Sequence, residues 1–349
     1  MQLLNLLLLF LPVSLFLEAS HAPAVWIFLT SALAILPLAA LMGRATEEVS
    51  HAAGPSLGGF LSATFGNAAE LILLLFALRA GLLELVKASI TGAIISNLLL
   101  ILGLSLLLGG LRYQTQEFNG RAAGVHSAML FLAVIGLVLP AIFSHATGHM
   151  PFTRVEGLSL AVAAVLMATY VLSLLFSLRT HRSLFAPVDA GEEVAGPRWT
   201  LRRSLLILAA TTVAVAWESE ILVGSLKEVM ATWGLTELFL GVIVIPLISN
   251  AAEHASAVLM AARNRMDLAL SIAVGSSTQI ALFVAPLLIF VSLAFGRPMT
   301  FIFNAFELAA LAAAVLIANL ISLDGETNWL EGVQLLAAYA IIGAAFYFI

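Results

Sequence analysis

Long apolar runs dominate the hydrophobic pattern of this chain. A helix needs roughly 20 apolar residues to cross a bilayer about 30 Å thick, and eleven runs approach or exceed that length. The apolar positions do not alternate with a period of two, so the pattern predicts α-helices and not a transmembrane β-barrel. The runs are 3–18, 24–44, 57–79, 85–108, 122–144, 155–178, 204–230, 236–262, 267–293, 300–322 and 329–348.

The composition agrees with a protein whose solvent is lipid. Of 349 residues, 62% are hydrophobic and 10% are charged, with a formal net charge of −5. Soluble domains are roughly 45–50% apolar and about 25% charged. These values exclude a soluble enzyme, a disordered regulator and a basic nucleic-acid-binding protein. The chain has no cysteine, which excludes disulfides and thiolate chemistry.

The distribution of basic residues predicts the orientation of the spans. With eleven spans, the loops on the side of the N-terminus carry ten of the 15 Lys and Arg residues. Basic loops stay in the cytoplasm, so we expect a cytoplasmic N-terminus and an external C-terminus. Run 3–18 is not preceded by a basic residue, and we interpret it as a retained span and not as a cleaved signal peptide.

One five-residue motif occurs twice in the chain. Residues 66–70 read Gly-Asn-Ala-Ala-Glu, and residues 249–253 read Ser-Asn-Ala-Ala-Glu. The same offset of 183 residues aligns Glu84 with Asp267, Gly92 with Gly275, and Ser96 with Gln279. A constant offset indicates duplication. The two copies lie an odd number of spans apart and therefore enter the membrane from opposite sides, as in inverted-repeat transporters.

The predicted fold class is an all-α polytopic membrane protein with eleven transmembrane helices, one N-terminal helix plus two inverted five-helix repeats. The connection 179–203 is the longest and divides the chain near its middle. It is either a solvated loop or a regulatory segment with three acidic residues. The predicted units are an N-terminal helix (1–20), a first repeat (21–178), a cytoplasmic linker (179–203) and a second repeat (204–349).

The two motifs place carboxylates at the centre of the membrane. A charged group there costs about 2.5–3.5 kcal/mol on insertion scales, so Glu70 and Glu253 must face an interior or a wet cavity. Asn67 and Asn250 precede them by three residues and share a helix face with them. Inverted symmetry would bring both pairs to one point. The alternative to an ion site is a purely structural role, in which each glutamate is protonated and donates a hydrogen bond to a neighbouring carbonyl.

This set of ligands is built from hard oxygen atoms. Calcium prefers six to eight oxygens from carboxylates, carbonyls and water, so we expect Glu70 and Glu253 to be metal ligands completed by Asn67 and Asn250. One divalent cation or two protons neutralise the two carboxylates equally well, which favours exchange over channel flow. Because His254 lies next to Glu253 and imidazole binds transition metals, Mn²⁺ remains an alternative substrate.

The next span of each half adds a second polar set. The first half contains Thr91, Gly92, Ser96 and Asn97, and the second contains the run Gly275 to Gln279. We predict that Ser96, Asn97, Ser277, Gln279 and His254 line the pathway, and that the glycines loosen the helices and expose carbonyls. Alternatively, each hydroxyl only bonds a carbonyl of its own helix.

Further acidic residues lie within or beside other predicted spans, with Glu47 late in the second span and Glu220 in the seventh. Glu47 and Glu220 are either vestibule acids that gather cations or relay protons, or plain interfacial charges. Glu48, Glu218 and Glu307 belong to the same class. Four histidines lie near predicted span ends, and we expect them to be solvated without a special role. They are His51, His126, His145 and His149.

Six segments of the chain resemble the CAX family of calcium/proton exchangers. The resemblance implies the eleven-helix fold, proton-driven export of cytosolic Ca²⁺, an ion site at Glu70 and Glu253, and an acidic helix between the sixth and seventh spans. With only three acids at 179–203, such a helix would be weak. The segments are GNAAELIL (66–73), SNLLLILG (96–103), THRSLF (180–185), PLISNAAEHASAV (246–258), GSSTQIALFVAP (275–286) and DGETNWLEG (324–332).

Several alternatives stay open beside this hypothesis. The chain could be a sodium-driven or broader divalent exchanger, for example for Mn²⁺, or a cation channel. An intramembrane protease is disfavoured because the motif Asn-Ala-Ala-Glu-His lacks the HExxH zinc spacing. We predict no enzyme activity and no cofactor besides transported Ca²⁺ and H⁺. The lipid bilayer is the expected partner, a homo-oligomer is left open, and the expected location is the cell (inner) membrane of a prokaryote.

Overall fold

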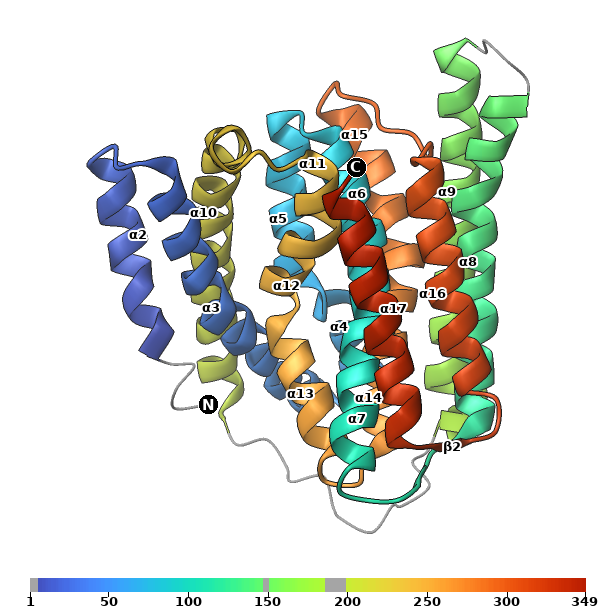
Figure 1. Cartoon of the computed structure of the whole chain (residues 1–349). Helices are drawn as coiled ribbons and strands as arrows, with labels where there is room; N and C mark the ends of the chain where they lie inside the picture. The colour runs from blue at the N-terminus through green and yellow to red at the C-terminus, as the bar shows by residue number, and fades with distance from the viewer. Residues whose placement is uncertain (1–5, 147–150, 186–198) are drawn as a thin grey trace.

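The computed structural model describes residues 6–146, 151–185 and 199–349, without the side chains of 55–57, 63, 145 and 146. Within these ranges the regular secondary structure is helical except for one short antiparallel ribbon, which the sequence had not predicted. Its strands are β1 (Gln116–Glu117) and β2 (Glu326–Thr327). Figure 1 shows the helices side by side, most of them running along the height of the molecule.

The first half of the chain runs from the N-terminal helix to the connection that follows residue 180. A 3₁₀ turn, η1, opens it, and the π-helical segments η2 and η3 extend longer helices. The elements are η1 (Leu7–Leu9), α2 (Phe10–Ala19), α3 (Ala24–Ala53), α4 (Pro55–Phe65), α5 (Ala68–Ala80), α6 (Leu83–Ile95), η2 (Ser96–Ile101), α7 (Leu102–Gly110), α8 (Gly120–Ala146), α9 (Phe152–Leu175), η3 (Phe176–Thr180) and η4 (Arg182–Phe185).

The second half begins with the longest helix of the described chain, and the π-helical segments η5 and η6 lie within it. The elements are α10 (Leu201–Trp233), α11 (Glu237–Phe239), η5 (Leu240–Val244), α12 (Ile245–Ser249), α13 (Ala251–Ala261), α14 (Met266–Gln279), η6 (Ile280–Val284), α15 (Ala285–Ala294), α16 (Ala305–Ile321) and α17 (Trp329–Tyr347). Each of the eleven apolar runs therefore overlaps helical structure.

Length and apolar composition identify the helices that can cross a membrane. Among the described residues, seven helices pass both criteria, and an eighth span exists if the bent pair Glu237–Ser249 and Ala251–Ala261 counts as one. The helices Leu7–Ala19 and Ala305–Ile321 are apolar but shorter. The chain is thus an all-helical, multi-pass membrane protein.

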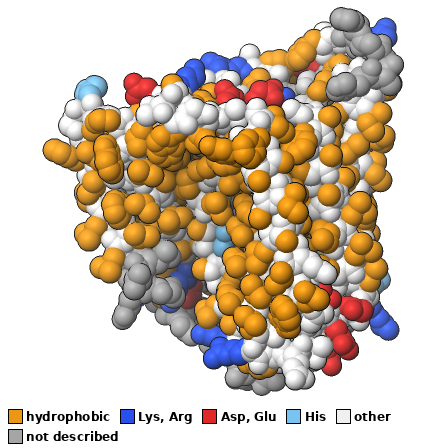
Figure 2. All heavy atoms as spheres, viewed as in Figure 1, with side chains coloured by type: hydrophobic (Ala, Val, Ile, Leu, Met, Phe, Trp, Pro, Cys, Tyr) orange, Lys and Arg blue, Asp and Glu red, His pale blue; other side chains and the backbone are white. Residues whose placement is uncertain are grey.

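The outer surface matches a lipid environment. Large apolar side chains are exposed along the helices, for example Leu206 (63%), Val213 (65%) and Ile341 (70%). Figure 2 shows hydrophobic side chains over the middle of the visible face, with most charged side chains near its two ends. Such a band is expected where lipid tails contact protein.

The two motif-bearing runs are not continuous helices, contrary to the prediction of unbroken spans over 57–79 and 236–262. Helix α4 ends at Phe65 and α5 starts at Ala68. Likewise α12 ends at Ser249 and α13 starts at Ala251, with a bend of 63°. Glycine, serine and asparagine are weak helix formers, and the long apolar flanks hide the interruption from a hydropathy pattern.

Candidate functional site

The site is built around the two helix breaks. Asn67 precedes α5 with φ −96° and ψ 27°, and Asn250 precedes α13 with φ −103° and ψ 5°. Both residues therefore lie outside the helical turns, in nearly the same conformation, and neither side chain caps its helix. The amide side chains remain available for other partners.

The first turn of each following helix carries the motif glutamate, Glu70 in α5 and Glu253 in α13. The backbone N–H groups at a helix N-terminus favour negative charge. In Figure 1, α5 runs from the break toward the upper end of the molecule, whereas α13 runs from its break toward the lower end. The two helix starts thus approach the middle of the molecule from opposite directions.

Glu70 lies deep in the protein and Glu253 is partly exposed, and both carboxylates have little compensation. Glu70 is 1% exposed, and neither of its carboxylate oxygens makes a hydrogen bond of regular geometry. The Asn250 side chain lies beside it, and Glu253 acts on it electrostatically. Glu253 Oε2 is also buried without a hydrogen-bond partner. Buried charge without compensation is unfavourable, so this pair requires a cation or protons.

A hydrogen-bonded chain links the two halves at the first break. The Asn97 amide donates to Ser276 Oγ over 3.2 Å, and Ser276 Oγ donates to Asn67 Oδ1 over 2.8 Å. All three residues are buried. The predicted Asn97 therefore faces the motif, while Ser276 was missing from the predicted site. The one feature of the sequence that pointed to Ser276 was its position in the polar run that starts at Gly275.

The second break lacks this chain of hydrogen bonds. The 183-residue offset places Ala93 where the second half has Ser276, and Ile280 where the first half has Asn97. Neither replacement offers a polar side chain. The side-chain nitrogens of Asn67 and Asn250 are both buried without a partner, so the difference lies in the hydrogen bond that Asn67 Oδ1 accepts from Ser276. The two half-sites match in backbone geometry and differ in chemistry.

The remaining predicted pathway residues divide into two groups. Ser96 Oγ donates to Ala93 O and Ser277 Oγ donates to Ala273 O, so both hydroxyls bond carbonyls of their own helices. By contrast, His254 Nε2 and Gln279 Nε2 are buried without hydrogen-bond partners. Gln279 also lies at the first break, with its Oε1 3.4 Å from the position that a Cβ on Gly66 would occupy. Gln279 and His254 thus retain free polar groups near the motifs.

The glycines do not loosen their helices, contrary to the prediction. Gly92 and Gly275 both lie in regular α-helix, and the π-helical segments begin further on, at Ser96 and Ile280. Gly92 instead permits close packing, because a Cβ there would collide with the Val242 backbone. A Cβ on Gly275 would have no atom within 4 Å.

This difference shows that the two halves pack unequally beside the site. Helix α6 is in close contact with η5 (the closed half), whereas α14 has no such contact at Gly275 (the open half). On α6, Ala88 is fully buried and would contact a Cβ built on Gly241 of η5. Its counterpart on α14, Ser271, is exposed. The half-helix α4, counterpart of η5 and α12, keeps Phe65 43% exposed. The end of the molecule that contains α4 and α13 is therefore the more loosely packed, open end.

The other predicted acids lie apart from the motifs. Glu47 and Glu220 are exposed. Glu48 Oε2 accepts a hydrogen bond from the Trp199 backbone over 3.1 Å, and the guanidinium groups of Arg44 and Arg203 lie over that indole ring. The structure therefore ties the end of the linker to α3, although most of the linker lies outside the described residues.

Glu307 and Glu218 have structural partners. Glu307 forms the capping box of α16 with Asn304 and accepts a second hydrogen bond from Thr91 over 3.1 Å. Glu218 contacts Ser14 of α2. Of the histidines, His51 is exposed, whereas His126 is partly buried with its ring against Phe185, so it is not simply solvated. The side chain of His145 and all of His149 lie outside the described residues.

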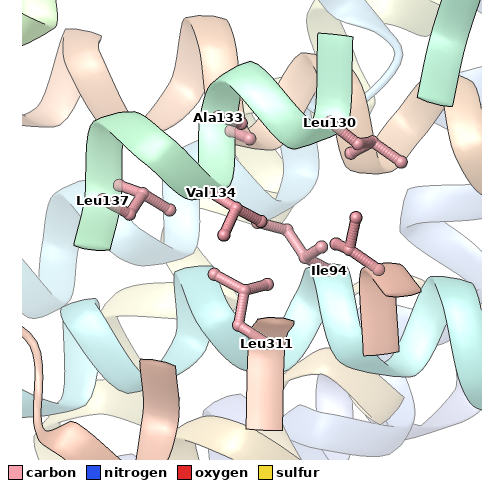
Figure 3. A pocket seen from close by; sticks show the side chains of 8 residues that line it. Ile94, Leu130, Ala133, Val134, Leu137 and Leu311 are labelled. Carbon is pink, nitrogen blue, oxygen red and sulfur yellow. The ribbon is translucent and has the colours of Figure 1, made fainter. Parts of the chain in front are cut away.

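Cavity geometry and charge clustering add two facts. An apolar crevice between α6, α8 and α16, lined by Ile94, Leu130 and Leu311 among others, is too narrow for water and has no polar lining (Figure 3). In the described ranges, no three acidic or histidine side chains cluster as a metal site. A divalent ion at the motifs would therefore need amide, hydroxyl or water oxygens beside the two carboxylates.

Comparison with known proteins identifies the family. The model of the family "Sodium/calcium exchanger protein" matches residues 23–179 and 203–348. The chain belongs to the sodium/calcium exchanger family. A Ca²⁺/H⁺ antiporter of Aphanothece halophytica is 50% identical over 98% of this chain and 95% of its own. The Ca²⁺/H⁺ antiporter ChaA of Bacillus subtilis is 44% identical over 96% of each chain. These relatives confirm the resemblance to calcium/proton exchangers, which are transporters and not enzymes.

Solved structures share this architecture. The structure of native YfkE superposes with a TM-score of 0.87 at 39% identity, covering 99% of this chain and 100% of that one. An H⁺/Ca²⁺ exchanger named CAX superposes with a TM-score of 0.73 over 99% of this chain and 91% of its own. At 18% identity, that second match speaks for the fold alone.

Proposed function

We propose that this protein is a secondary antiporter that exports cytosolic Ca²⁺ in exchange for H⁺ across the cell membrane. The observation that carries the proposal is the pair of poorly compensated carboxylates in the first turns of α5 and α13, of which Glu70 is fully buried and Glu253 partly buried. The names of the relatives, which are Ca²⁺/H⁺ antiporters in several bacteria, support it.

In the proposed site, Glu70 and Glu253 ligate Ca²⁺ or carry protons. Asn67 and Asn250 supply amide oxygens, and water completes the shell. Asn97 and Ser276 hold the Asn67 amide in place by hydrogen bonds. Gln279 and His254 line the ion pathway next to the site. Ser96 and Ser277 lie along the same pathway, but their hydroxyls bond carbonyls of their own helices and do not reach the ion. The oxygen-only set favours Ca²⁺, which accepts flexible coordination of six to eight oxygens.

The proposed cycle rests on neutralisation of charge. Cytosolic Ca²⁺ displaces protons from the two glutamates, and the neutral, occupied site passes through the membrane. On the outside, protons displace Ca²⁺, and the protonated site returns. The empty, doubly charged site is disfavoured because burying two uncompensated like charges is costly. Because the site cannot cross the membrane without either Ca²⁺ or protons, the flux of Ca²⁺ is coupled to the opposite flux of protons.

The proposed topology has eleven spans with α2 as an extra first span. The repeats at 21–178 and 204–349 are inverted, and the linker 179–203 is cytoplasmic. Helix pairs α4–α5 and α12–α13 then each form one broken span, and α2 and α16 are short spans. The positive-inside rule places the N-terminus in the cytoplasm, so the open end with α4 and α13 faces the cytosol.

Flux in proteoliposomes tests the function. Vesicles with an acidic lumen should take up Ca²⁺ when they contain the wild-type protein, and Glu70→Gln or Glu253→Gln should abolish uptake. Glu228→Gln, an exposed acid on α10, is the matched control and should transport normally. Uptake by either motif variant at the wild-type rate contradicts the proposal.

The same vesicles separate the alternatives. A sodium gradient in place of the proton gradient should drive no uptake, and uptake under it would identify a sodium-driven exchanger. Competition by Mn²⁺ measures how broad the selectivity is. A channel would pass Ca²⁺ down its own gradient at constant pH without moving protons.

A further inference from the structure

Glu218 is a buried acid that the transport site does not use. It lies near the middle of α10, is 1% exposed, and contacts Ser14 of the N-terminal helix α2, which is fully buried. The distance from Ser14 Oγ to Glu218 Oε1 is 2.6 Å. Helix α2 lies at one side of the molecule against α3 and α10 (Figure 1), and it precedes the region matched by the family model.

The hydrogen bonds at Ser14 accommodate a proton on Glu218. The hydroxyl has one hydrogen and two acceptors within reach, Leu11 O at 2.9 Å and Glu218 Oε1 at 2.6 Å. Helical serines commonly donate to a carbonyl three or four residues earlier, as Ser31 does toward Ile27 O. When Ser14 donates to Leu11, a proton on Glu218 must supply the hydrogen bond to Ser14 Oγ.

Among the described residues, the Ser14 hydroxyl is the one group seen to offer Glu218 a hydrogen bond. Its second oxygen, Oε2, is buried without a hydrogen-bond partner. The charged group that acts on it is Glu18 of α2, which is also negative. An ionised carboxylate at this depth would be strongly disfavoured.

We propose that Glu218 is a second proton-binding site, separate from the transport site, that holds the N-terminal helix in place only while it is protonated. Loss of the proton would place two negative groups, Glu218 and Glu18, across the same interface. It would also leave an ionised carboxylate with a single donor. The docked position of α2 would then be weakened.

Packing connects this interface to the transport site. Leu8 and Leu11 pack in one apolar cluster with Met42 of α3, Val215 of α10 and Ala69 of α5. Ala69 directly precedes the motif glutamate. Docking of α2 therefore supports the first turn of α5. An effect of this site on exchange rate rests on the proposed function, whereas the proton site itself does not.

The pH dependence of thermal unfolding tests the proton site. The folded protein binds this proton more tightly than the unfolded chain, so its contribution to stability is lost as pH rises. In Glu218→Gln the amide donates to Ser14 permanently. The variant should match the wild-type melting temperature at acidic pH and exceed it by about 2–4 °C at alkaline pH. A difference that does not change with pH overturns the proposal.

Two further variants control for structural effects. Ser14→Ala should lower the melting temperature at acidic pH and have less effect at alkaline pH. Glu228→Gln, an exposed acid on the same helix, should follow the wild-type pH profile. Repeating the Glu218→Gln comparison in a Glu70→Gln/Glu253→Gln background removes titration of the transport acids, and the difference should persist. These measurements need no transport, so they remain decisive if Ca²⁺/H⁺ exchange is absent.

Discussion

Ser276 on α14 donates a hydrogen bond to Asn67 Oδ1 at the first helix break over a distance of 2.8 Å. The bond joins residues that are 209 positions apart and belong to different halves of the chain. It has no equivalent at the second break, where Ala93 occupies the corresponding position. The two repeated motifs thus share their backbone geometry and differ in this hydrogen bond.

Ser276→Ala should weaken Ca²⁺ binding. The change removes the donor to Asn67 and the acceptor for Asn97, and a buried polar group left without its partner costs about 1–3 kcal/mol. We expect a loss of about 5- to 100-fold in apparent Ca²⁺ affinity, measured by calorimetric titration. The neighbouring Ser277→Ala is the control, because that hydroxyl bonds only Ala273 O of its own helix. Equal effects of the two variants would exclude a role for the Asn67 contact.

The apparent Ca²⁺ affinity should fall as the pH is lowered. Protons and Ca²⁺ compete for the same carboxylates, and each displaced proton contributes up to about tenfold per pH unit. Two protons per Ca²⁺ would give about 100-fold per unit, measured by titration across pH. Glu70→Gln should show at most about tenfold per unit. An affinity independent of pH would rule out proton competition at this site.

Two glycines related by the repeat should respond oppositely to alanine. Gly92→Ala would collide with the Val242 backbone, and overpacking costs about 1–3 kcal/mol. Gly275→Ala meets no atom within 4 Å and should be neutral or stabilising by about 0.5–1 kcal/mol, because alanine favours helix. Thermal unfolding in detergent compares them. If both lower the melting temperature alike, the closed and open halves are assigned wrongly.

The absence of native cysteine makes the orientation easy to test. Leu323 lies after α16 and is 70% exposed, and Phe348 lies after α17 and is 85% exposed. In intact cells, an impermeant maleimide should label Phe348→Cys and should not label Leu323→Cys. Both variants should react after the cells are opened. Labelling of Leu323→Cys in intact cells would reverse the proposed orientation.

The sequence supported the fold class well and the local geometry poorly. Within the described residues each of the eleven apolar runs overlaps helix, because burial in lipid imposes a hydropathy signal that is independent of packing. The breaks at Asn67 and Asn250 were missed, since a short polar interruption between long apolar flanks does not lower their mean hydropathy. The packing role of Gly92 was also invisible, because it depends on Val242, 150 positions away in the chain.

The sequence by itself determined the membrane class, the duplication and the two motif glutamates. Charge is so rare in these apolar runs that two identical acidic motifs at a constant offset stand out. Only the tertiary structure decided which polar groups meet them, selecting Ser276 over Ser277, and which half of the molecule is closed. It also paired Glu218 with Ser14. Such contacts depend on the direction in which each side chain leaves its helix, and therefore on how helices from both halves pack together.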